Sequence, residues 1–389
     1  MALTNSQEIA YQRIMSWYRN KESDVFKLGG PAGSGKSYLI SLVADAIGVD
    51  NCLLITPTGK AANNLIKASL PAHTIHSQIY HVRSDNGDEG GIDFETVGES
   101  EFKNLSAMLE QSATKGYTFG SEEAHFCLKD ELDSKYQLII IDEGSMVGGN
   151  LLSDVLSFGI PTLLVGDPNQ LPPVNDSTVF KKCDYYLTEI VRQAQGSPVI
   201  YLSQEVLQGR LAAGCYGTCM VRRGPVSDDE LRYADIVLTD TNVSRTNLNS
   251  RMRRMSLDFR SQAKPLSVGD RIICRTNTSI TSSEGFSLTN GAQGTIKKIK
   301  HTNSNCSLID LVMSTPDLGD FSFIGTTRPE LFPATVRPPK IEYGYALTVH
   351  LSQGSEWANV IYQQSSAMRK SAMYTAITRA KESVLIALD

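Results

Sequence analysis

The chain has 389 residues, with 37 lysines and arginines against 42 aspartates and glutamates, and so a formal net charge of −5 at pH 7. At roughly 150 residues per domain the length predicts two or three domains, and a hydrophobic content of 41% excludes disorder, collagen and a disulfide-stapled miniprotein. The acidic average argues against a nucleic-acid-binding protein, since such domains usually carry a basic excess, but it does not say where the charges lie.

Seven cysteines are scattered without the spacing of a disulfide framework, which favours a reducing compartment. Cys215 and Cys219 have no matching cysteine or histidine pair nearby, so a zinc site is not expected. The N-terminus lacks the layout of a signal peptide, and no apolar run is long enough to span a membrane. We therefore expect a cytoplasmic protein without a membrane span.

The first part of the chain alternates helices with short apolar strands. Ile9, Ile14 and Trp17 at near-helical spacing predict a helix over 6–19. The strands predicted after it are Val25–Leu28, Cys52–Ile55, Leu138–Ile141 and Pro161–Val165. A helix over Tyr38–Ile47, ended by Gly48, follows the first of these strands, and a helix through Lys67 follows the second. Each strand is followed by polar residues, which indicates an open parallel sheet covered on both faces. Ligands bind at the carboxyl ends of such strands.

The alternation stops between His81 and Asp130. Within this stretch, residues 84–101 hold seven acidic residues and no lysine or arginine, which is typical of a surface insertion. Since −5 + 7 = +2, the remainder of the chain is close to neutral. The acidic average therefore reflects one insertion and does not exclude a nucleic-acid partner.

A second βα region begins at Ile236–Thr239, followed by the basic helix SRTNLNSRMRR. From about Val268 to Ile341, short alternating strands broken by Gly and Asn predict a small β-barrel. The C-terminus returns to the βα pattern, with a strand at Val360–Tyr362, a helix near 371–381 and a strand at Val384–Ala387. The fold class is thus α/β, with two parallel-sheet halves and two inserts.

The segment from Gly30 to Ser37, GPAGSGKS, fits the G-x-x-x-x-G-K-[ST] motif and lies between a strand and a helix. The backbone N–H groups of such a loop surround phosphate oxygens. Lys36 would reach the β- and γ-phosphates of ATP, and the Ser37 hydroxyl would ligate Mg²⁺. The predicted ATP-binding residues of this loop are Gly30, Pro31, Ala32, Gly33, Ser34, Gly35, Lys36 and Ser37.

Asp142 and Glu143 follow the strand LIII, where one carboxylate can hold Mg²⁺ and the other can orient and deprotonate water. Gln170, in GDPNQ at the next strand end, carries an amide that can contact a γ-phosphate or water, although an exposed turn residue is the simpler interpretation. Arg192, after LTEIV, and Arg379, on the last predicted helix, could stabilise γ-phosphoryl charge. A single arginine is normally a surface residue, so spacing alone does not support these two assignments.

An ordered set of segments resembles the motif series of superfamily 1 helicases, in particular the RecD/Dda branch, whose members translocate 5′ to 3′ on single-stranded DNA. The segments are GPAGSGKS, TPTGKAA, TIHS, IIIDEGSM, VGDPNQLPPV, LTEIVRQ, TVHLSQGSEW and YTAITRAK. The resemblance implies that Gln7 reads adenine and that Lys36, Ser37, Asp142 and Glu143 form the ATPase core. It also implies that Gln170 senses the γ-phosphate and that Arg192 and Arg379 are the catalytic arginines.

The same resemblance implies a DNA track of short hydroxyl and imidazole side chains, which suit phosphate contacts without sequence readout. The residues concerned are Thr56, Thr58, His76, Thr348, His350 and Ser352, together with Arg275 and Asn277 at the entrance of an SH3-like insert. The insert over 81–130 takes the place of the strand-separating pin, with Phe94, Phe102, Tyr117, Phe119 or Phe126 as a candidate wedge. Two departures are Leu351, where the family usually has lysine, and Gly144, where a small apolar residue is usual and whose turn we expect to be looser.

The resemblance implies two RecA-like ATPase domains, residues 1–80 with 131–190 and residues 191–274 with 341–389, interrupted by the inserts 81–130 and 275–340. We expect an ATP- and Mg²⁺-dependent helicase that moves 5′ to 3′ on single-stranded DNA and unwinds forked duplexes. Alternatives are a translocase that displaces proteins with little unwinding, or a nucleotide-gated DNA-binding subunit of a larger complex. We expect a monomer in a bacterial or phage-infected cell, with single-strand-binding, replication or recombination proteins as further partners.

Overall fold

The computed structural model describes residues 3–83, 102–103, 125–173, 176–191, 196–262, 264–278, 280–303, 307–316, 318–332, 338–365 and 369–389. The chain divides into two compact units. Unit 1 comprises Met1–His81, Leu128–Ser244 and Leu347–Asp389, and unit 2 comprises Val82–Cys127 and Arg245–Ala346. The finer division into two RecA-like domains and two inserts remains a prediction.

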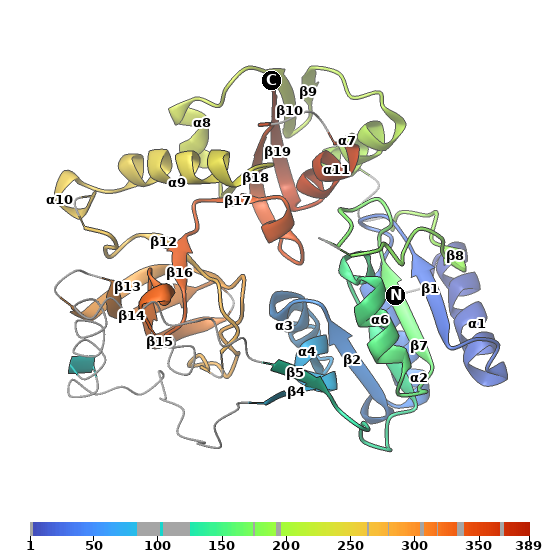
Figure 1. Cartoon of the computed structure of the whole chain (residues 1–389). Coiled ribbons are helices and arrows are strands. Elements are labelled where there is room, and N and C mark those ends of the chain that lie inside the picture. The colour runs from blue at the N-terminus through green and yellow to red at the C-terminus, as the bar shows by residue number, and fades with distance from the viewer. Residues whose placement is uncertain are drawn as a thin grey trace. The chain divides into compact units, whose positions relative to one another are not determined.

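Unit 1 contains a six-stranded parallel sheet near the N-terminus (Figure 1). Its strands, in the order β3-β2-β6-β7-β1-β8, are Ala72–Thr74, Cys52–Thr56, Leu138–Ile141, Thr162–Gly166, Val25–Gly29 and Tyr185–Tyr186. Every neighbouring pair is parallel. The sequence prediction of β2, β6 and β7 is therefore confirmed to within one residue at each end.

Helices cover both faces of this sheet because its strands are apolar on both sides. Leu138 and Ile140 of β6 belong to one core cluster, and Ile139 and Ile141 belong to another on the opposite face. The helices α1, α2 and α3 (Asn5–Asn20, Lys36–Ile47 and Gly59–Lys67) supply the first cluster, whereas α4 and α6 (Ile75–Ile79 and Gly149–Leu156) supply the second. The predicted N-terminal helix is confirmed, but Ile9 is 39% exposed and lies outside the core.

The second sheet of unit 1 has the order β17-β11-β18-β19-β10-β9, namely Ala346–Thr348, Ile236–Thr239, Trp357–Gln363, Ala380–Leu388, Cys219–Arg223 and Gly214–Tyr216. The pairs β11–β18, β18–β19 and β19–β10 are parallel, while the edge strand β9 is antiparallel to β10. The helices of this part are α7, α8 and α11 (Pro198–Gln208, Asp228–Tyr233 and Lys370–Ile377), and α7 and α11 pack on each other and on β19.

The last helix is shorter than predicted. It ends at Ile377, not at 381, because the chain enters β19 at Ala380. Arg379 therefore lies in the turn between helix and strand and not on the helix.

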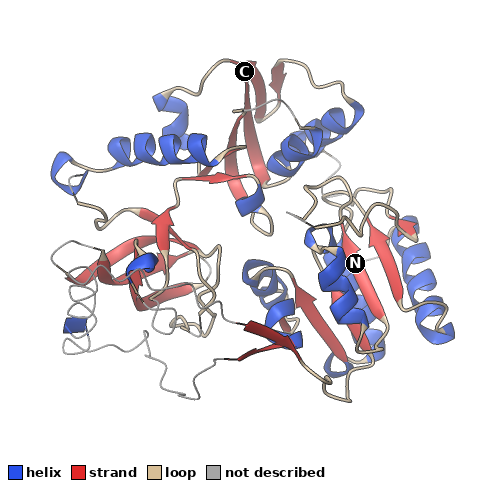
Figure 2. Cartoon of the chain, viewed as in Figure 1, coloured by secondary structure: helices blue, strands red, loops and turns tan. Residues whose placement is uncertain are grey.

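Unit 2 contains a five-stranded antiparallel sheet of order β15-β14-β13-β12-β16, namely Gly319–Thr326, Leu308–Thr315, Gln293–Thr302, Arg271–Cys274 and Ile341–Tyr343 (Figure 2). Its inward residues form one apolar cluster that includes Ile272, Leu311 and Phe323. The helices of this part are α9 and α10 (Asn242–Ser256 and Phe259–Gln262). The predicted change to short β-strands is confirmed, whereas the SH3-like character of the insert remains a prediction.

Two short strands, β4 and β5 (Tyr80–Arg83 and His125–Leu128), flank the acidic insertion. Residues 84–101, 104–124 and the side chain of Phe126 lie outside the described part, and with them most of the candidate wedge. Phe102 is buried, and its ring lies 5.7 Å from that of His301, which does not fit an exposed wedge. Short 3-10 helices occur at Val49–Asn51, Gly144–Met146, Pro329–Leu331 and His350–Ser352.

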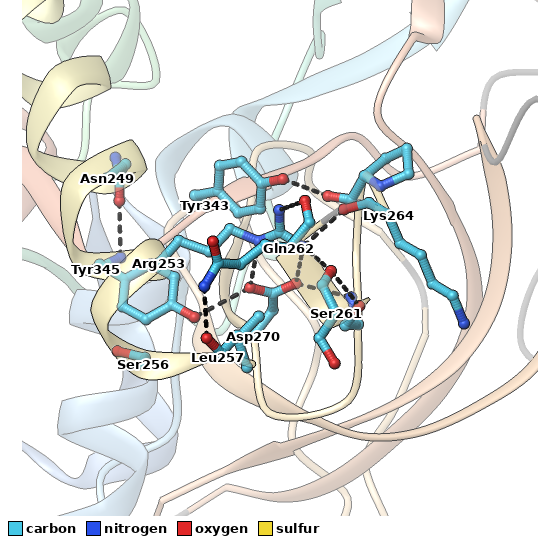
Figure 3. A network of polar contacts seen from close by, with 12 residues as sticks. Asn249, Arg253, Ser256, Leu257, Ser261, Gln262, Lys264, Asp270, Tyr343 and Tyr345 are labelled. Atoms are coloured by element: carbon cyan, nitrogen blue, oxygen red, sulfur yellow. Dashed lines mark hydrogen bonds and ion pairs between the residues drawn. The ribbon is translucent and has the colours of Figure 1, made fainter. Parts of the chain in front are cut away.

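A buried ion pair joins Arg253 of α9 to Asp270, the residue directly before β12 (Figure 3). Arg253 donates from Nε and Nη2 to the two carboxylate oxygens of Asp270, at 2.8 and 3.1 Å. Ser267 N–H and the Tyr345 hydroxyl also donate to this carboxylate, at 2.7 and 3.0 Å. The Tyr343 ring lies 5.0 Å from the Arg253 guanidinium. The charge of Asp270, which is fully buried, is therefore completely satisfied.

The other guanidinium contacts of Arg253 are to the backbone carbonyls of Ser261, Gln262 and Lys264. This arginine therefore also fixes the course of the chain between α9 and β12. Asn249 completes the junction, because its Oδ1 accepts from the N–H groups of Tyr345 and Ala346 at 2.9 Å each.

Among the described residues, none of the helices has the length and apolar character needed to cross a bilayer.

We predict that Asp270→Ala lowers the free energy of unfolding of unit 2 by about 3–5 kcal/mol, because Arg253 would keep a buried charge without its partner. Asp320→Ala is the matched control: it removes a pair with Lys297, which is 62% exposed, and should cost less than about 1 kcal/mol. Urea-dependent hydrogen exchange of peptides from 264–303 measures unit 2 separately, since two units need not unfold together. Equal losses in the two variants would contradict the prediction.

Candidate nucleotide site

The carboxyl ends of β6, β7 and β1 lie side by side at one edge of the first sheet, because these three strands are parallel neighbours. The phosphate loop follows β1, Asp142 and Glu143 follow β6, and Asp167 follows β7. The structure therefore brings the phosphate loop together with two polar segments that follow it by more than 100 residues in the sequence.

The phosphate loop turns through two glycines with left-handed backbone, Gly33 at φ 76° and Gly35 at φ 77°. These angles favour glycine, and they direct the chain into α2, which begins at Lys36. Lys36 Nζ donates to the carbonyls of Gly30 and Pro31, at 2.9 and 3.0 Å. The ammonium is thus held inside the curve of its own loop, beside the backbone that would surround phosphate oxygens.

Gln7 lies against the phosphate loop from α1. Its Nε2 donates to the Ser34 carbonyl at 3.0 Å, and its Oε1 accepts from Thr4 N–H at 3.0 Å as part of a capping box. Both ends of the amide thus have partners within the protein. The position beside the loop agrees with a residue near the nucleotide, and the adenine-reading role stays a prediction.

Asp142 and Glu143 occupy a tight turn after β6. Glu143 has φ 54°, a left-handed conformation that is uncommon for residues other than glycine, and its N–H donates to Asp142 Oδ1 at 2.8 Å. Burial, and next the neighbouring Glu143 carboxylate, raise the pKa of Asp142 to about 6, while that N–H bond and the Lys36 ammonium act in the opposite direction.

The donor atoms at this edge fit a magnesium ion. The carboxylates of Asp142 and Glu143 and the exposed hydroxyl of Ser37 are oxygen ligands of the kind that Mg²⁺ prefers. A divalent cation would also relieve the repulsion that raises the pKa of Asp142.

The loop after β7 holds Gln170, whose side chain is buried at 7% exposure. Its Oε1 has no hydrogen-bond partner among the described residues. A buried amide oxygen without a partner is costly, and an acceptor in this place suits a water molecule or another polar ligand. The interpretation of Gln170 as an exposed turn residue is therefore wrong.

Arg379 is also buried, at 4% exposure. Its guanidinium donates to Thr375 O, Ser355 O and Thr378 Oγ1 at 3.2 to 3.3 Å, and it forms no ion pair within the part of the chain that is described. An arginine that binds only neutral acceptors keeps its charge available for an anion. It is not a surface residue, and Arg192 lies outside the described residues.

Contacts from α11 reach this edge, and the sequence did not predict them. The Tyr374 hydroxyl donates to Asp167 Oδ2 at 2.5 Å and accepts from Ala32 N–H at 3.3 Å. Thr375 Oγ1 accepts from Leu171 N–H at 2.9 Å. Tyr374 and Thr375 lie in YTAITRAK, so the motif pointed to the segment but not to these side chains.

A second group of contacts joins α3 to the segment after β17. Asn64 Nδ2 donates to Gly354 O at 3.0 Å, and a Cβ on Gly354 would lie 3.2 Å from Thr58 Oγ1. Lys60 Nζ lies 4.8 Å from the centre of the Trp357 ring. Burial, and next the charges of Lys67 and Arg379, lower the pKa of Lys60 to about 7, whereas the indole favours its charged form.

The predicted DNA-track residues of unit 1 differ in exposure. His76 and His350 are exposed. Thr56 and Ser352 are fully buried and donate to the carbonyls of Thr58 and Val349, at 2.8 and 2.7 Å, so their hydroxyls fix the turns that follow β2 and β17. Two further hydroxyls accept backbone N–H groups, Thr58 from Ala61 and Thr348 from Leu351. Their contacts with DNA stay predictions.

The two predicted DNA residues of unit 2 lie beyond β12. Arg275 is half-buried with its Nε 3.7 Å from Glu342 Oε2, and Asn277 is exposed and accepts from Asn290 N–H at 3.0 Å. A role in DNA binding stays a prediction for both.

Two glycines allow the turn after β6 to approach the end of β7. A Cβ on Gly144 would lie 2.8 Å from the Leu164 side chain, and one on Gly166 would lie 2.9 and 3.0 Å from the backbone nitrogens of Ser145 and Gly144. The expectation of a looser turn at Gly144 is wrong, because the missing side chain allows close packing and does not leave space.

Residues 2–218, more than half of the chain, match the family model described as an AAA domain, and residues 343–387 match that of the UvrD-like helicase C-terminal domain. A relative in Deinococcus radiodurans, the ATP-dependent RecD2 DNA helicase, is 25% identical over 91% of this chain and 45% of its own length. The chain spans less than half the length of the curated relatives it matches.

Solved structures of Pif1 helicases have the same fold. One, described as unwinding forked double-stranded DNA by two coordinating Pif1 helicases, has a TM-score of 0.57 at 19% identity and covers 99% of this chain and 92% of its own. The Pif1 helicase from Bacteroides with ADP-AlF3 and single-stranded DNA has a TM-score of 0.56 at 19% identity, with the same coverage. These likenesses confirm the parallel-sheet fold.

We predict that Gly166→Ala destabilises unit 1 more than Gly144→Ala. The added methyl of the first meets backbone atoms, while that of the second meets the flexible Leu164 side chain first, and overpacking of this kind costs about 1–3 kcal/mol. Urea unfolding of both variants, followed by hydrogen exchange of peptides from 138–170, measures the difference. A larger loss in Gly144→Ala would contradict the prediction.

Proposed function

We propose that this chain, which belongs to the AAA-domain family and continues into a UvrD-like helicase C-terminal domain, is an ATP-dependent DNA helicase of superfamily 1. One observation carries the proposal: α11 contacts the edge of the first sheet where the phosphate loop and the loop after β7 meet, through Tyr374 and Thr375, and Arg379 donates to Thr375 of that helix. An ATPase site built from two sheets can convert nucleotide turnover into relative motion of those sheets.

Each side chain at the edge has a task in hydrolysis. Lys36 would bind the β- and γ-phosphates. Ser37 and Asp142 would hold Mg²⁺, which would supply charge neutralisation when it is bound. Glu143 orients the attacking water and accepts its proton. Gln170 accepts a hydrogen bond from that water through its free Oε1, or donates from its amide nitrogen to the γ-phosphate. Arg379, with Arg192, stabilises the charge that develops on the phosphoryl group.

The DNA substrate would lie along Thr58, His76, Thr348 and His350. By the resemblance to superfamily 1 helicases, Arg275 and Asn277 would also contact DNA. The buried hydroxyls of Thr56 and Ser352 would act indirectly, by fixing the turns that follow β2 and β17. Short polar side chains of this kind grip the backbone without reading sequence. By its resemblance to the RecD/Dda branch, we propose movement from 5′ to 3′ on single-stranded DNA by a monomer.

We predict that Glu143→Gln lowers DNA-stimulated ATP turnover by about 10²–10⁴-fold, the usual contribution of a general base, and leaves ATP binding in place. Steady-state hydrolysis with and without single-stranded DNA, and equilibrium binding of a fluorescent ATP analogue, measure the two effects. Glu330→Gln is the control, since that carboxylate is 64% exposed in unit 2. A wild-type protein that shows no ATPase activity, with or without DNA, would contradict the proposed function.

We further predict that forked duplexes with a 5′ single-stranded tail are unwound and that those with only a 3′ tail are not. Strand separation on matched forks in the presence of Mg²⁺ and ATP measures this. Unwinding restricted to 3′ tails would contradict the direction of movement. DNA-stimulated hydrolysis without unwinding of either fork would favour a translocase.

A further inference from the structure

The hydroxyl of Tyr374 lies at a junction of three segments of unit 1. It donates to Asp167 Oδ2 at 2.5 Å and accepts from the phosphate-loop N–H of Ala32 at 3.3 Å, while its own backbone belongs to α11. Tyr374 and Asp167 are both fully buried, and they are 207 residues apart in the sequence. One hydroxyl therefore connects the phosphate loop, the loop after β7 and the last helix.

Asp167 organises the loop that carries Gln170. Its Oδ1 accepts from the N–H and from Nδ2 of Asn169, at 3.0 and 3.1 Å, and its carbonyl accepts from Gln170 N–H at 3.1 Å. Both carboxylate oxygens are therefore in use, one within the loop and one on Tyr374. Hydrogen bonds to a buried carboxylate are about twice as strong as neutral ones, so the conformation of the loop depends on the position of the tyrosine.

Contacts on the other side of Gln170 lead to the same helix. Leu171 donates its N–H to Thr375 Oγ1 at 2.9 Å, and its carbonyl accepts from Gln353 Nε2 at 3.1 Å. Asp167, three residues before Gln170, and Leu171, directly after it, are thus held by two adjacent residues of α11, and Gln353 adds a third contact.

The connection continues to Arg379. Its Nε donates to the carbonyl of Thr375, four residues earlier, at 3.2 Å. The same helix therefore contacts both the loop of Gln170 and the arginine.

The tyrosine keeps its proton in this environment. Burial, and next the charge of Asp167, raise the pKa of Tyr374 far above its ordinary value. Its hydroxyl thus always has a proton to donate to Asp167 and a lone pair to accept from Ala32. Backbone N–H groups of a phosphate loop are also donors to nucleotide phosphates, so a bound phosphate and Tyr374 would compete for the Ala32 N–H.

We propose that Tyr374 is a positioning residue for ATP hydrolysis. Its hydroxyl connects the phosphate loop and Asp167 to α11, and this connection sets the distance between Gln170 and Arg379 that turnover needs. This inference rests on the proposed ATPase function and deepens it. The tyrosine touches no reacting group: it acts through the two residues that do.

The test is Tyr374→Phe, which keeps the ring and removes only the hydroxyl. Tyr362→Phe is a matched control, because Tyr362 is equally buried and its hydroxyl donates to Asp240 Oδ1 at 2.7 Å in the second sheet. Each variant thus loses one bond from a buried tyrosine to an aspartate, but only the bond of Tyr374 lies at the nucleotide edge. DNA-stimulated ATP hydrolysis would be measured for wild type and for both variants over a range of ATP concentrations.

We expect Tyr374→Phe to lower kcat by about 10-fold or more, the effect of one bond to a charged group. KM should stay the same or fall, because the Ala32 N–H no longer has a competing acceptor and the loss lies in the transition state. Tyr362→Phe should leave both constants within about 2-fold of wild type, since it removes no contact at the edge. Hydrogen exchange of peptides from 30–35 and 166–172 should become faster in Tyr374→Phe and stay unchanged in Tyr362→Phe.

An active wild type with an unchanged kcat in Tyr374→Phe would overturn this inference alone. Equal losses in the two phenylalanine variants would also overturn it, because they would indicate a general effect on stability. An inactive wild type would instead overturn the proposed function. In that case, unchanged exchange in Tyr374→Phe would show that the hydroxyl does not connect the three segments either.

Discussion

Parallel pairing of β6, β7 and β1 is the constraint from which the candidate site follows. In-register parallel neighbours must end at the same edge, and so three loops from distant parts of the sequence are brought within contact of one another. The sheet can be parallel on both sides of β7 because the strands are apolar on both faces and helices cover each face. The chemistry at the edge therefore depends on packing in the interior, far from any phosphate.

Much of this arrangement could be predicted from local sequence. A continuous apolar run such as LIII is a strand with little ambiguity, and β6 and β11 have the predicted ends. The phosphate loop was predicted because glycine spacing is a direct requirement of its backbone, as the positive φ angles of Gly33 and Gly35 show. These features are visible in the sequence because neighbouring residues alone determine them.

Features set by distant contacts were predicted poorly. The helix that contains Tyr374 ends before Arg379 because the chain enters β19 at Ala380. Helical periodicity in the sequence does not predict where such a helix ends. Thr56 and Ser352 belong to motif segments, yet their hydroxyls are buried against backbone, since a motif names a segment and not the direction of each side chain. The bond from Tyr374 to Asp167 was likewise not predictable, because no local pattern relates two residues 207 positions apart.

The junction around Asp270 has a consequence for how unit 2 could have arisen. One carboxylate holds Arg253 and Ser267, before the antiparallel sheet, and Tyr345, after it, so the chain enters and leaves that sheet at a single point. Termini that lie close together are what make a segment transferable between hosts. The sheet is thus organised as a cassette, which evolution could lengthen, shorten or replace between its two ends without altering the chain on either side.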